Sequence, residues 1–217
     1  MIATARLEHF AVVTFAADRG ALERLLPDGV EVDLPLVSAV AYRYKHLRVC
    51  GVPGVTLTGG QVHFRAYVRV GAHCGVWFLA TVQDSRWANL PRWVWGMPWS
   101  RGAVDVSAPR DGQVVVSAAG VDMELRQSSP GTSGPPIPTQ VSTATAGWYQ
   151  GRRNLMRFDV SFDELCLVPA TATVARVERF EDLGLVSPGQ APDSAFRHGD
   201  TEIQIHLPPR PIPAARH

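Results

Sequence analysis

Hydrophobic and polar residues alternate most clearly between Gln61 and Val70. The hydrophobic positions of this segment fall on one side of an extended chain and are Val62, Phe64, Ala66, Val68 and Val70. The polar positions fall on the other side and are Gln61, His63, Arg65, Tyr67 and Arg69. A period of two predicts a β-strand with one face in a hydrophobic core. Residues 71–75 predict a turn, and the almost wholly hydrophobic segment 76–82 predicts a returning strand that is buried on both faces.

Further strands are predicted along most of the chain, separated by residues that favour turns. They span residues 10–15, 36–45, 104–108, 113–118, 121–126, 170–180 and 202–207. Three short helices are also predicted, and the residues that cap them are Asp18 (helix 19–26), Asp84 or Ser85 (before Pro91) and Ser161 (capping box 161–164). Many short strands and few short helices favour a mainly β fold, an antiparallel barrel or sandwich.

The chain is long enough for one sizeable core. It has 217 residues, 46% of them hydrophobic, which predicts a single domain over residues 1–217. Gly, Ser and Pro dominate residues 127–140, and this composition predicts a flexible loop that is either a lid or a disordered excursion. Residues 208–217 are expected to be a frayed tail. Residues 51–60 are expected to form a second loop.

Charge and composition limit the kinds of molecule that are expected to bind this protein. The net charge is +1, so neither nucleic acid nor an anionic membrane is expected as a partner. No segment approaches the run of about 18 apolar residues that a membrane span needs, and the N-terminus lacks a signal-peptide pattern. Three widely spaced cysteines predict no disulfide framework, and neither a metal nor a cofactor is expected. We therefore expect a cytoplasmic protein that binds a small organic metabolite, with a homo-oligomer left open.

Five segments resemble the acetoacetate decarboxylase superfamily, in the same order along the chain. They are HFAVVTFAADRGALERLLPDGVEVDLPLV, TGGQVHFRAYVR, SRWANLPRWVWGMPWSRG, SFDELCLVPATA and FRHGDTEIQIHLPP. The chain is most similar to the uncharacterised YqjF-like branch, a domain of unknown function. The resemblance implies a curled antiparallel β-barrel or cone with a few short helices, built around one buried pocket.

The same resemblance implies that the parent reaction is lost. The family's signature is an aromatic-Pro-Lys-Lys turn, whose first Lys forms a Schiff base with the substrate. The turn here is Trp-Gly-Met-Pro-Trp-Ser, residues 95–100. The positions that correspond to the two lysines, the two acidic residues and the substrate-binding Arg are Trp99, Ser100, Thr58, Val40 and Glu8. None of the five matches the family's residue, so Schiff-base decarboxylation is not expected.

Two groups of residues are candidates for a site inside this barrel. The proposed catalytic residues are Gln61, His63 and Arg65. His can transfer a proton near neutral pH, and Arg can hold a carboxylate in bidentate fashion. Alternatively, this polar face is solvated or meets another subunit. The proposed substrate-binding residues are Trp99, Met97, Tyr42, Tyr44, Thr58 and Arg101, for which core packing or surface exposure is the alternative.

These candidates indicate an enzyme that acts on a carbonyl- or carboxylate-bearing metabolite by acid–base chemistry. A lyase, dehydratase, isomerase or cyclase would fit this description. The alternative is a non-catalytic domain that binds or senses a small ligand. An acid–base pair that converges on the pocket would favour the enzyme, and a wholly apolar pocket would favour the binding domain.

The lone lysine gives the first testable prediction. Alternation along residues 36–45 places Lys45 on the face opposite Val40, Tyr42 and Tyr44, and no other Lys is available to form an imine. Incubation with acetoacetate or pyruvate followed by borohydride should therefore leave the protein mass unchanged in a mass spectrum. A stable adduct on Lys45 would contradict this expectation.

Overall fold

The structure is a computed structural model that describes residues 1–49, 56–110, 112–128, 141, 145–162 and 166–212. The elements in these ranges, in chain order, are β1 Ile2–Ala16, α1 Arg19–Leu25, β2 Glu31–Val49, β3 Leu57–Val70, β4 His73–Gln83, α2 Asn89–Trp95, β5 Trp99–Arg101, β6 Val104–Ser107, β7 Gln113–Ala118, β8 Val121–Gln127, β9 Ala146–Gln150, β10 Leu155–Phe162, β11 Val168–Val177, α4 Glu178–Asp182, β12 Ser194–His198, β13 Thr201–His206 and β14 Arg210–Pro211. No helix among these elements is long and apolar enough to cross a membrane.

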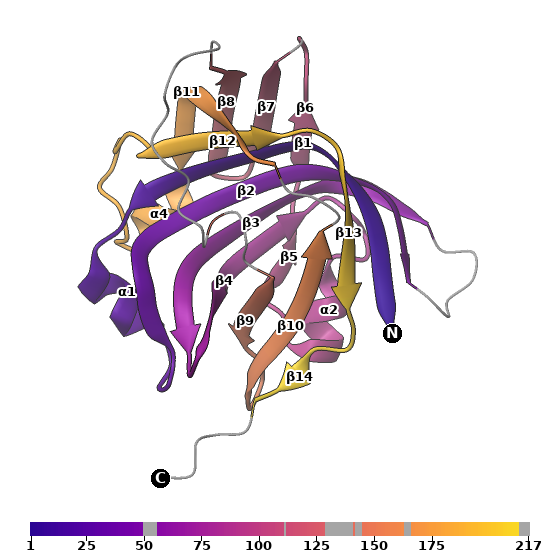
Figure 1. Ribbon diagram of the computed structural model, residues 1–217, viewed down its shortest axis with the longest axis vertical. Helices are drawn as coiled ribbons and strands as arrows, with labels where there is room; N and C mark the ends of the chain where they lie inside the picture. Colours follow the sequence, from indigo (N-terminus) through magenta and orange to yellow (C-terminus); the bar gives the residue numbers. More distant parts are fainter. Residues whose placement is uncertain (50–55, 111, 129–140, 142–144, 163–165, 213–217) are drawn as a thin grey trace.

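Seven strands close into a barrel, in the order β13-β10-β9-β4-β3-β2-β1 and back to β13. The long strands β1 to β4 curl around the interior (Figure 1). This arrangement confirms the predicted mainly β fold and the curled barrel. Most pairings are antiparallel, but β4 pairs in parallel with both β5 and β9. The sheet is therefore mixed around β4, whereas the closing pair β1–β13 is antiparallel.

A second layer of strands begins where the second half of β1 leaves the barrel. The first half of β1 pairs with β13 from Ile2 to Leu7, and the second half pairs with β12 from Phe10 to Thr14. The sheet extends from β12 through β11, β8, β7 and β6, each paired with the next, and these strands lie to one side of the barrel (Figure 1). The switch occurs at a bulge where His9 has a positive φ of 54°. Because the bulge adds a residue, Leu7 and Phe10 both face the barrel interior.

The long strands separate two hydrophobic cores. Strand β3 shows this most clearly, because Val62, Phe64 and Val68 pack into the core between the barrel wall and the second layer. Tyr67 belongs to the other core, which surrounds the barrel interior. The alternation between these two environments follows the period of two that the sequence predicts. Both faces of β3 are therefore buried, and the polar face points inward.

Several predicted elements are confirmed with different bounds. Asp18 caps α1 by accepting a hydrogen bond from the backbone N–H of Ala21 at 2.6 Å. Strands β1 and β2 extend well beyond the predicted 10–15 and 36–45. Strand β1 pairs with β2 on one side and with β13 and then β12 on the other, while β2 pairs with β1 and β3. Residues 57–60 of the predicted loop belong to β3.

Other predicted elements are wrong or lie outside the described residues. The predicted helix does not begin at Ser161, because both Ser161 and Phe162 pair with β13 as part of β10, and residues 163–165 of this prediction lie outside the described residues. Cross-strand pairing outweighs the local capping pattern at this position. Residues 178–180 belong to α4 rather than to a strand. Of the predicted tail, Arg210–Pro211 pairs with β10, while residues 129–140 of the predicted flexible loop lie outside the described residues.

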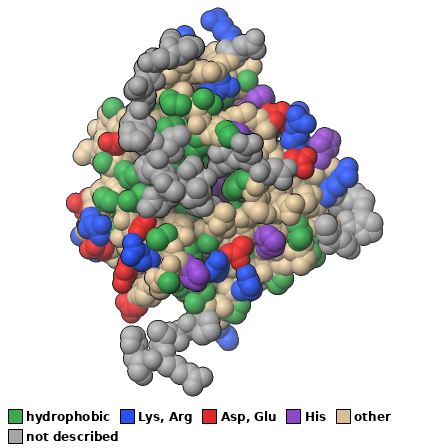
Figure 2. Space-filling view, viewed as in Figure 1, with side chains coloured by type: hydrophobic (Ala, Val, Ile, Leu, Met, Phe, Trp, Pro, Cys, Tyr) green, Lys and Arg blue, Asp and Glu red, His purple; other side chains and the backbone are tan. Residues whose placement is uncertain are grey.

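Charged side chains of both signs are interspersed on the face seen in Figure 2. They lie mainly around its margin, and hydrophobic side chains lie among them. No large area of a single charge is visible on this face.

The junction of β4 and β9 gives a stability prediction. Gly75 of β4 lies against the backbone oxygen of Ala146 and the ring of Trp148, so an added Cβ would overlap both. We expect Gly75→Ala to lower the free energy of unfolding by about 1–3 kcal/mol, as measured by urea denaturation. Gly199→Ala is the matched control, because a Cβ added at that position would have no other atom within 4 Å. Equal stability of the two variants would contradict the packing described for this junction.

Candidate functional site

The barrel encloses a cavity of about 220 Å³. Most of the surrounding side chains are hydrophobic and come from β1, β2, β4, α2, β10 and β13. The polar side chains that line it are Tyr42, Tyr44, Gln61, His63, Arg65, Gln83 and Ser85. All but Ser85 belong to three adjacent strands, so the polar groups form one strip on an otherwise hydrophobic wall.

Strand register arranges this strip in rows. Tyr42, Gln61 and Gln83 are directly opposite one another across β2, β3 and β4. His63 lies in the next row, opposite Thr81, and Arg65 lies one row further, opposite Ser38. Successive rows are two residues apart, so their backbones are separated by roughly 7 Å.

His63 is held in a buried hydrogen-bonded network. Its Nε2 lies 2.7 Å from the Tyr42 hydroxyl, and its Nδ1 lies 2.8 Å from Oγ1 of Thr81. The ring also contacts the edge of Phe78, with ring centroids 5.0 Å apart. Both ring nitrogens are therefore used, and a neutral imidazole must accept one of these hydrogen bonds and donate the other.

Burial controls the protonation state of this network. Desolvation, together with the nearby charge of Arg65, lowers the pKa of His63 to about 3. Desolvation raises the pKa of the Tyr42 hydroxyl above its usual value, and it also raises the pKa of Tyr44. At neutral pH the imidazole is uncharged and Tyr42 keeps its proton. When Nε2–H donates to the Tyr42 oxygen and Nδ1 accepts from the Thr81 hydroxyl, the single proton of Tyr42 is free to be donated to a group that develops negative charge.

Arg65 brings a positive charge to the cavity without an acidic partner. Its Nε donates to Oγ of Ser38 at 3.3 Å, and the Tyr67 hydroxyl donates to the same oxygen at 2.9 Å. None of the ion pairs among the described residues includes Arg65. A partly buried guanidinium without a counter-charge favours the binding of an anion, and its planar fork suits a carboxylate.

The aromatic side of the cavity is built by α2 and β5. Gly96 ends α2 in a left-handed conformation, with φ of 70°, and its N–H donates to the carbonyl of Arg92. The chain then turns so that β5 pairs with β4 and Trp99 lies opposite Thr81. Met97, which is 3% exposed, and Trp99 both line the cavity. The side chain of Trp99 thus reaches the barrel interior.

Two candidates from the sequence lie elsewhere. Thr58 is exposed and does not line the cavity. It shares its face of β3 with Val62, which points away from the interior. Arg101 is the exposed last residue of β5 and is also absent from the cavity wall. The expectation that these two side chains line the pocket is wrong, whereas Gln61, His63, Arg65, Tyr42, Tyr44, Met97 and Trp99 do line it.

The lone lysine lies outside the cavity wall. Its Nζ pairs with Oε2 of Glu8 at 2.7 Å. Lys45 thus faces away from the lining residues of its own strand, Tyr42 and Tyr44, as the alternation predicts.

Three polar residues near the cavity were not predicted from the sequence. Thr81 lies within the almost wholly hydrophobic segment 76–82, and Gln83 and Ser85 follow it. Thr81 and Gln83 are 0% and 4% exposed. Their spacing of two residues is a signal for a shared face, but only the register with β3 places them opposite His63 and Gln61.

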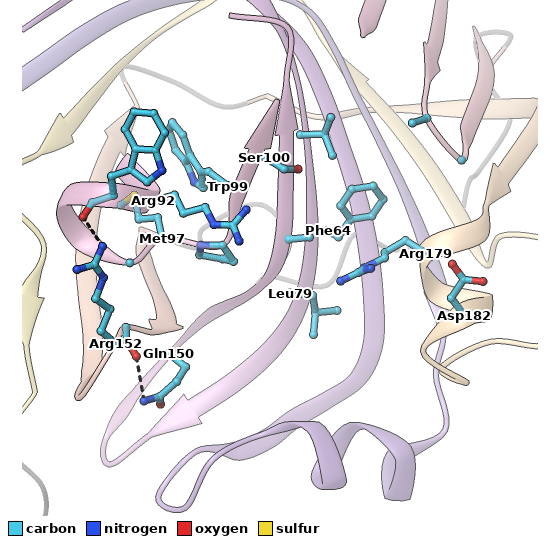
Figure 3. A pocket seen from close by; sticks show the side chains of 18 of the residues that line it. Phe64, Leu79, Arg92, Met97, Trp99, Ser100, Gln150, Arg152, Arg179 and Asp182 are labelled. Carbon is cyan, nitrogen blue, oxygen red and sulfur yellow. Dashed lines mark hydrogen bonds between the residues drawn. The ribbon is translucent and has the colours of Figure 1, made fainter. Parts of the chain in front are cut away.

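A broader groove of about 910 Å³ lies on the other side of α2 and β5 (Figure 3). It shares Met97 and Trp99 with the cavity, and Arg92 and Arg179 extend over it. Arg152 at its edge donates a hydrogen bond to the carbonyl of Trp93 at 2.8 Å. These arginines are exposed to solvent. The enclosed barrel cavity is therefore the better candidate for a small-molecule site.

Comparison with solved structures identifies the class of fold. The enduracididine biosynthesis enzyme MppR, complexed with the condensation product of pyruvate and imidazole 4-carboxaldehyde, superposes with a TM-score of 0.71 at 16% identity over 97% of this chain and 88% of that chain. Acetoacetate decarboxylase from Legionella pneumophila gives a TM-score of 0.69 at 11% identity over 98% and 87%. An acetoacetate decarboxylase-like enzyme from Sphingomonas wittichii gives 0.62 at 13% identity over 94% and 90%. The chain has the acetoacetate decarboxylase-like fold, and identities this low establish the fold alone.

The sequence places the chain within one family of that class. Residues 4–199 match DUF2071, described as an uncharacterized conserved protein, so the chain belongs to the DUF2071 family. No curated protein matches the chain. The resemblance to the superfamily is confirmed, together with its placement in an uncharacterised branch.

The buried imidazole gives a prediction about pH. Because the pKa of His63 is about 3 in the folded protein and 6.5 ordinarily, the unfolded chain binds more protons between these values. Stability from this group is complete above pH 6.5 and falls as the pH decreases toward 3. His63 alone should remove about 2 kcal/mol of unfolding free energy between pH 7 and pH 5.

Urea denaturation at the two pH values tests this expectation. His63→Gln should flatten the decrease, whereas His206→Gln, at an exposed position of β13, should leave it unchanged. An equally steep decrease in the His63→Gln protein would contradict a buried, neutral imidazole.

Proposed function

We propose that the barrel cavity binds a small carboxylate that also bears a carbonyl group, and that the protein catalyses proton transfer on it without a Schiff base. The observation that carries this proposal is the guanidinium of Arg65, which has no acidic partner among the described residues and lies in a hydrophobic cavity, one row from the Tyr42–His63 hydrogen bond. The reaction class would be that of a lyase, dehydratase, isomerase or cyclase.

The proposed roles follow from charge and hydrogen bonding. Arg65 would hold the carboxylate by charge-assisted hydrogen bonds. As a proton leaves the carbon beside the carbonyl for solvent, Tyr42 would donate a hydrogen bond to the carbonyl oxygen, on which negative charge develops. His63 would hold the hydroxyl of Tyr42 in place, because its Nε2 lies 2.7 Å from that oxygen.

Ligand binding would also make His63 more basic. The charge of Arg65 is the second cause of its low pKa, after burial. A bound carboxylate would neutralise that charge and raise the pKa of the imidazole. The network would then exchange protons more readily with substrate in place than in the empty protein.

A non-catalytic binding or sensing domain is the second candidate function. Both nitrogens of His63 are already bonded to protein groups, Tyr42 and Thr81. An imidazole held in this way can be a fixed part of the wall and need not act as a base. Binding of a carboxylate without any exchange of protons would favour this alternative.

Proton exchange in deuterium oxide distinguishes the two functions. A panel of 2-oxo acids is incubated with the protein, and deuterium at the carbon beside the carbonyl is measured by NMR. We expect faster exchange than in protein-free samples and a loss of at least about a hundredfold in Tyr42→Phe. Exchange that is unaffected by Tyr42→Phe would contradict the assigned role of this hydroxyl.

Thermal shift and calorimetry with the same acids test the role of Arg65. Arg65→Met should weaken carboxylate binding by roughly tenfold or more, since it removes a charge-assisted hydrogen bond. Arg24→Met is the matched control, on the exposed side of α1. If no carboxylate binds the wild-type protein, the proposed function is wrong.

A further inference from the structure

Two buried amides in the cavity make no side-chain hydrogen bond to any residue that the structure describes. Gln61 and Gln83 are 5% and 4% exposed, and both line the cavity. Across the described part of the chain, neither side chain takes part in a hydrogen bond. Buried amides are almost always hydrogen-bonded, because each one left unpaired costs free energy. Two unpaired amides that share one cavity therefore suggest a ligand group that bonds to both.

Their position brings the two amides together. Gln61 and Gln83 are directly opposite one another on the antiparallel strands β3 and β4, and such pairs have Cβ atoms roughly 5 Å apart. Each carboxamide offers an N–H donor and a carbonyl acceptor. The pair can thus bind a neutral group that carries both a donor and an acceptor.

The chemistry of this row disfavours a charged ligand group. The row contains Tyr42, Gln61 and Gln83, none of which carries a charge at neutral pH. A buried charge without a counter-charge would be strongly unfavourable here. A primary amide, or a ring edge with adjacent N–H and C=O groups, would satisfy both glutamines without that cost.

We infer that the Gln61–Gln83 pair is a recognition subsite for a neutral amide-like group of a ligand whose carboxylate is held by Arg65. The inference rests on the proposed function, since it uses Arg65 for the other end of the same ligand. Arg65 and Gln61 are four residues apart on β3, so their Cα atoms are separated by roughly 13 Å. The substrate class is therefore a carboxylate with an amide-like group at its far end.

The middle of the ligand would be a ring or a compact hydrophobic segment. Phe78, Phe158 and Trp99 contribute to the wall around the cavity. An apolar cavity of about 150 Å³ can hold one benzene ring, and the cavity here is about 220 Å³. A single ring with two small polar substituents fits this volume.

Matched ligands test the subsite. Para-carbamoylbenzoate and para-isopropylbenzoate have the same shape and the same carboxylate, but only the first has an amide. A second pair of ligands carries one more methylene between the ring and the amide or isopropyl group. The two pairs thus test two distances between the carboxylate and the variable group. Calorimetry should show roughly tenfold tighter binding of the amide in at least one pair.

Gln61→Met and Gln83→Met should reduce this preference to less than threefold, because Met has a similar shape without the amide. The same variants should melt a few degrees higher than the wild type without ligand, since a buried unpaired amide is removed. Gln204→Met is the control, at an exposed position of β13, and should change neither quantity. A preference for the amide that persists in both cavity variants would overturn the subsite.

The possible failures of the two proposals are distinguishable. If both benzoates of each pair bind equally and Arg65→Met weakens both, the proposed carboxylate site stands and the amide subsite is wrong. If small 2-oxo acids bind but no benzoate does, the ring-bearing ligand with an amide is wrong. If no carboxylate binds at all, the proposed function fails and the inference fails with it.

Discussion

The structure depends on the pairing of β2, β3 and β4 in a register that buries both of their faces. One face packs between the barrel wall and the second layer, where Val62 and Phe64 lie. The other face points into the barrel, where Gln61, His63 and Arg65 lie. A shift of one residue would exchange the two sets and place a cation and two polar groups in a hydrophobic core. The hydrophobic face therefore fixes the position of the polar face.

This constraint explains why polar groups can be retained deep in the protein. Both ring nitrogens of His63 are hydrogen-bonded, to Tyr42 and to Thr81, so neither nitrogen loses a hydrogen bond on burial. Arg65 and the two cavity glutamines are different, because their polar atoms face the cavity with few or no partners. Such groups reduce the stability of the empty protein. Their presence on a rigid wall is typical of a site that binds its ligand with preformed groups.

Local patterns predicted the fold where tertiary contacts agree with them. The alternation of β3, the Asp18 cap of α1 and the hairpin of β3 and β4 could all be predicted from sequence. The capping pattern at Ser161 failed because pairing with β13 continues the strand through this residue. Thr81 was missed because hydrophobic residues flank it on both sides, and Gln83 was missed because only its register opposite Gln61 places it at the cavity. Thr58 was misplaced because its face of β3 is turned away from the cavity.

The sequence by itself determined the mainly β class, the superfamily, the shared face of Gln61, His63 and Arg65, and the lack of a lysine at residue 99. These properties depend on the order of residues over short distances. In a strand, side chains two residues apart point to the same face, so this order alone shows which side chains share a face. Only the tertiary structure decided which groups meet across strands: Tyr42 with His63, His63 with Thr81, and Gln61 with Gln83. Register depends on bulges and on closure of the whole barrel, and these arise from packing between segments far apart in the chain.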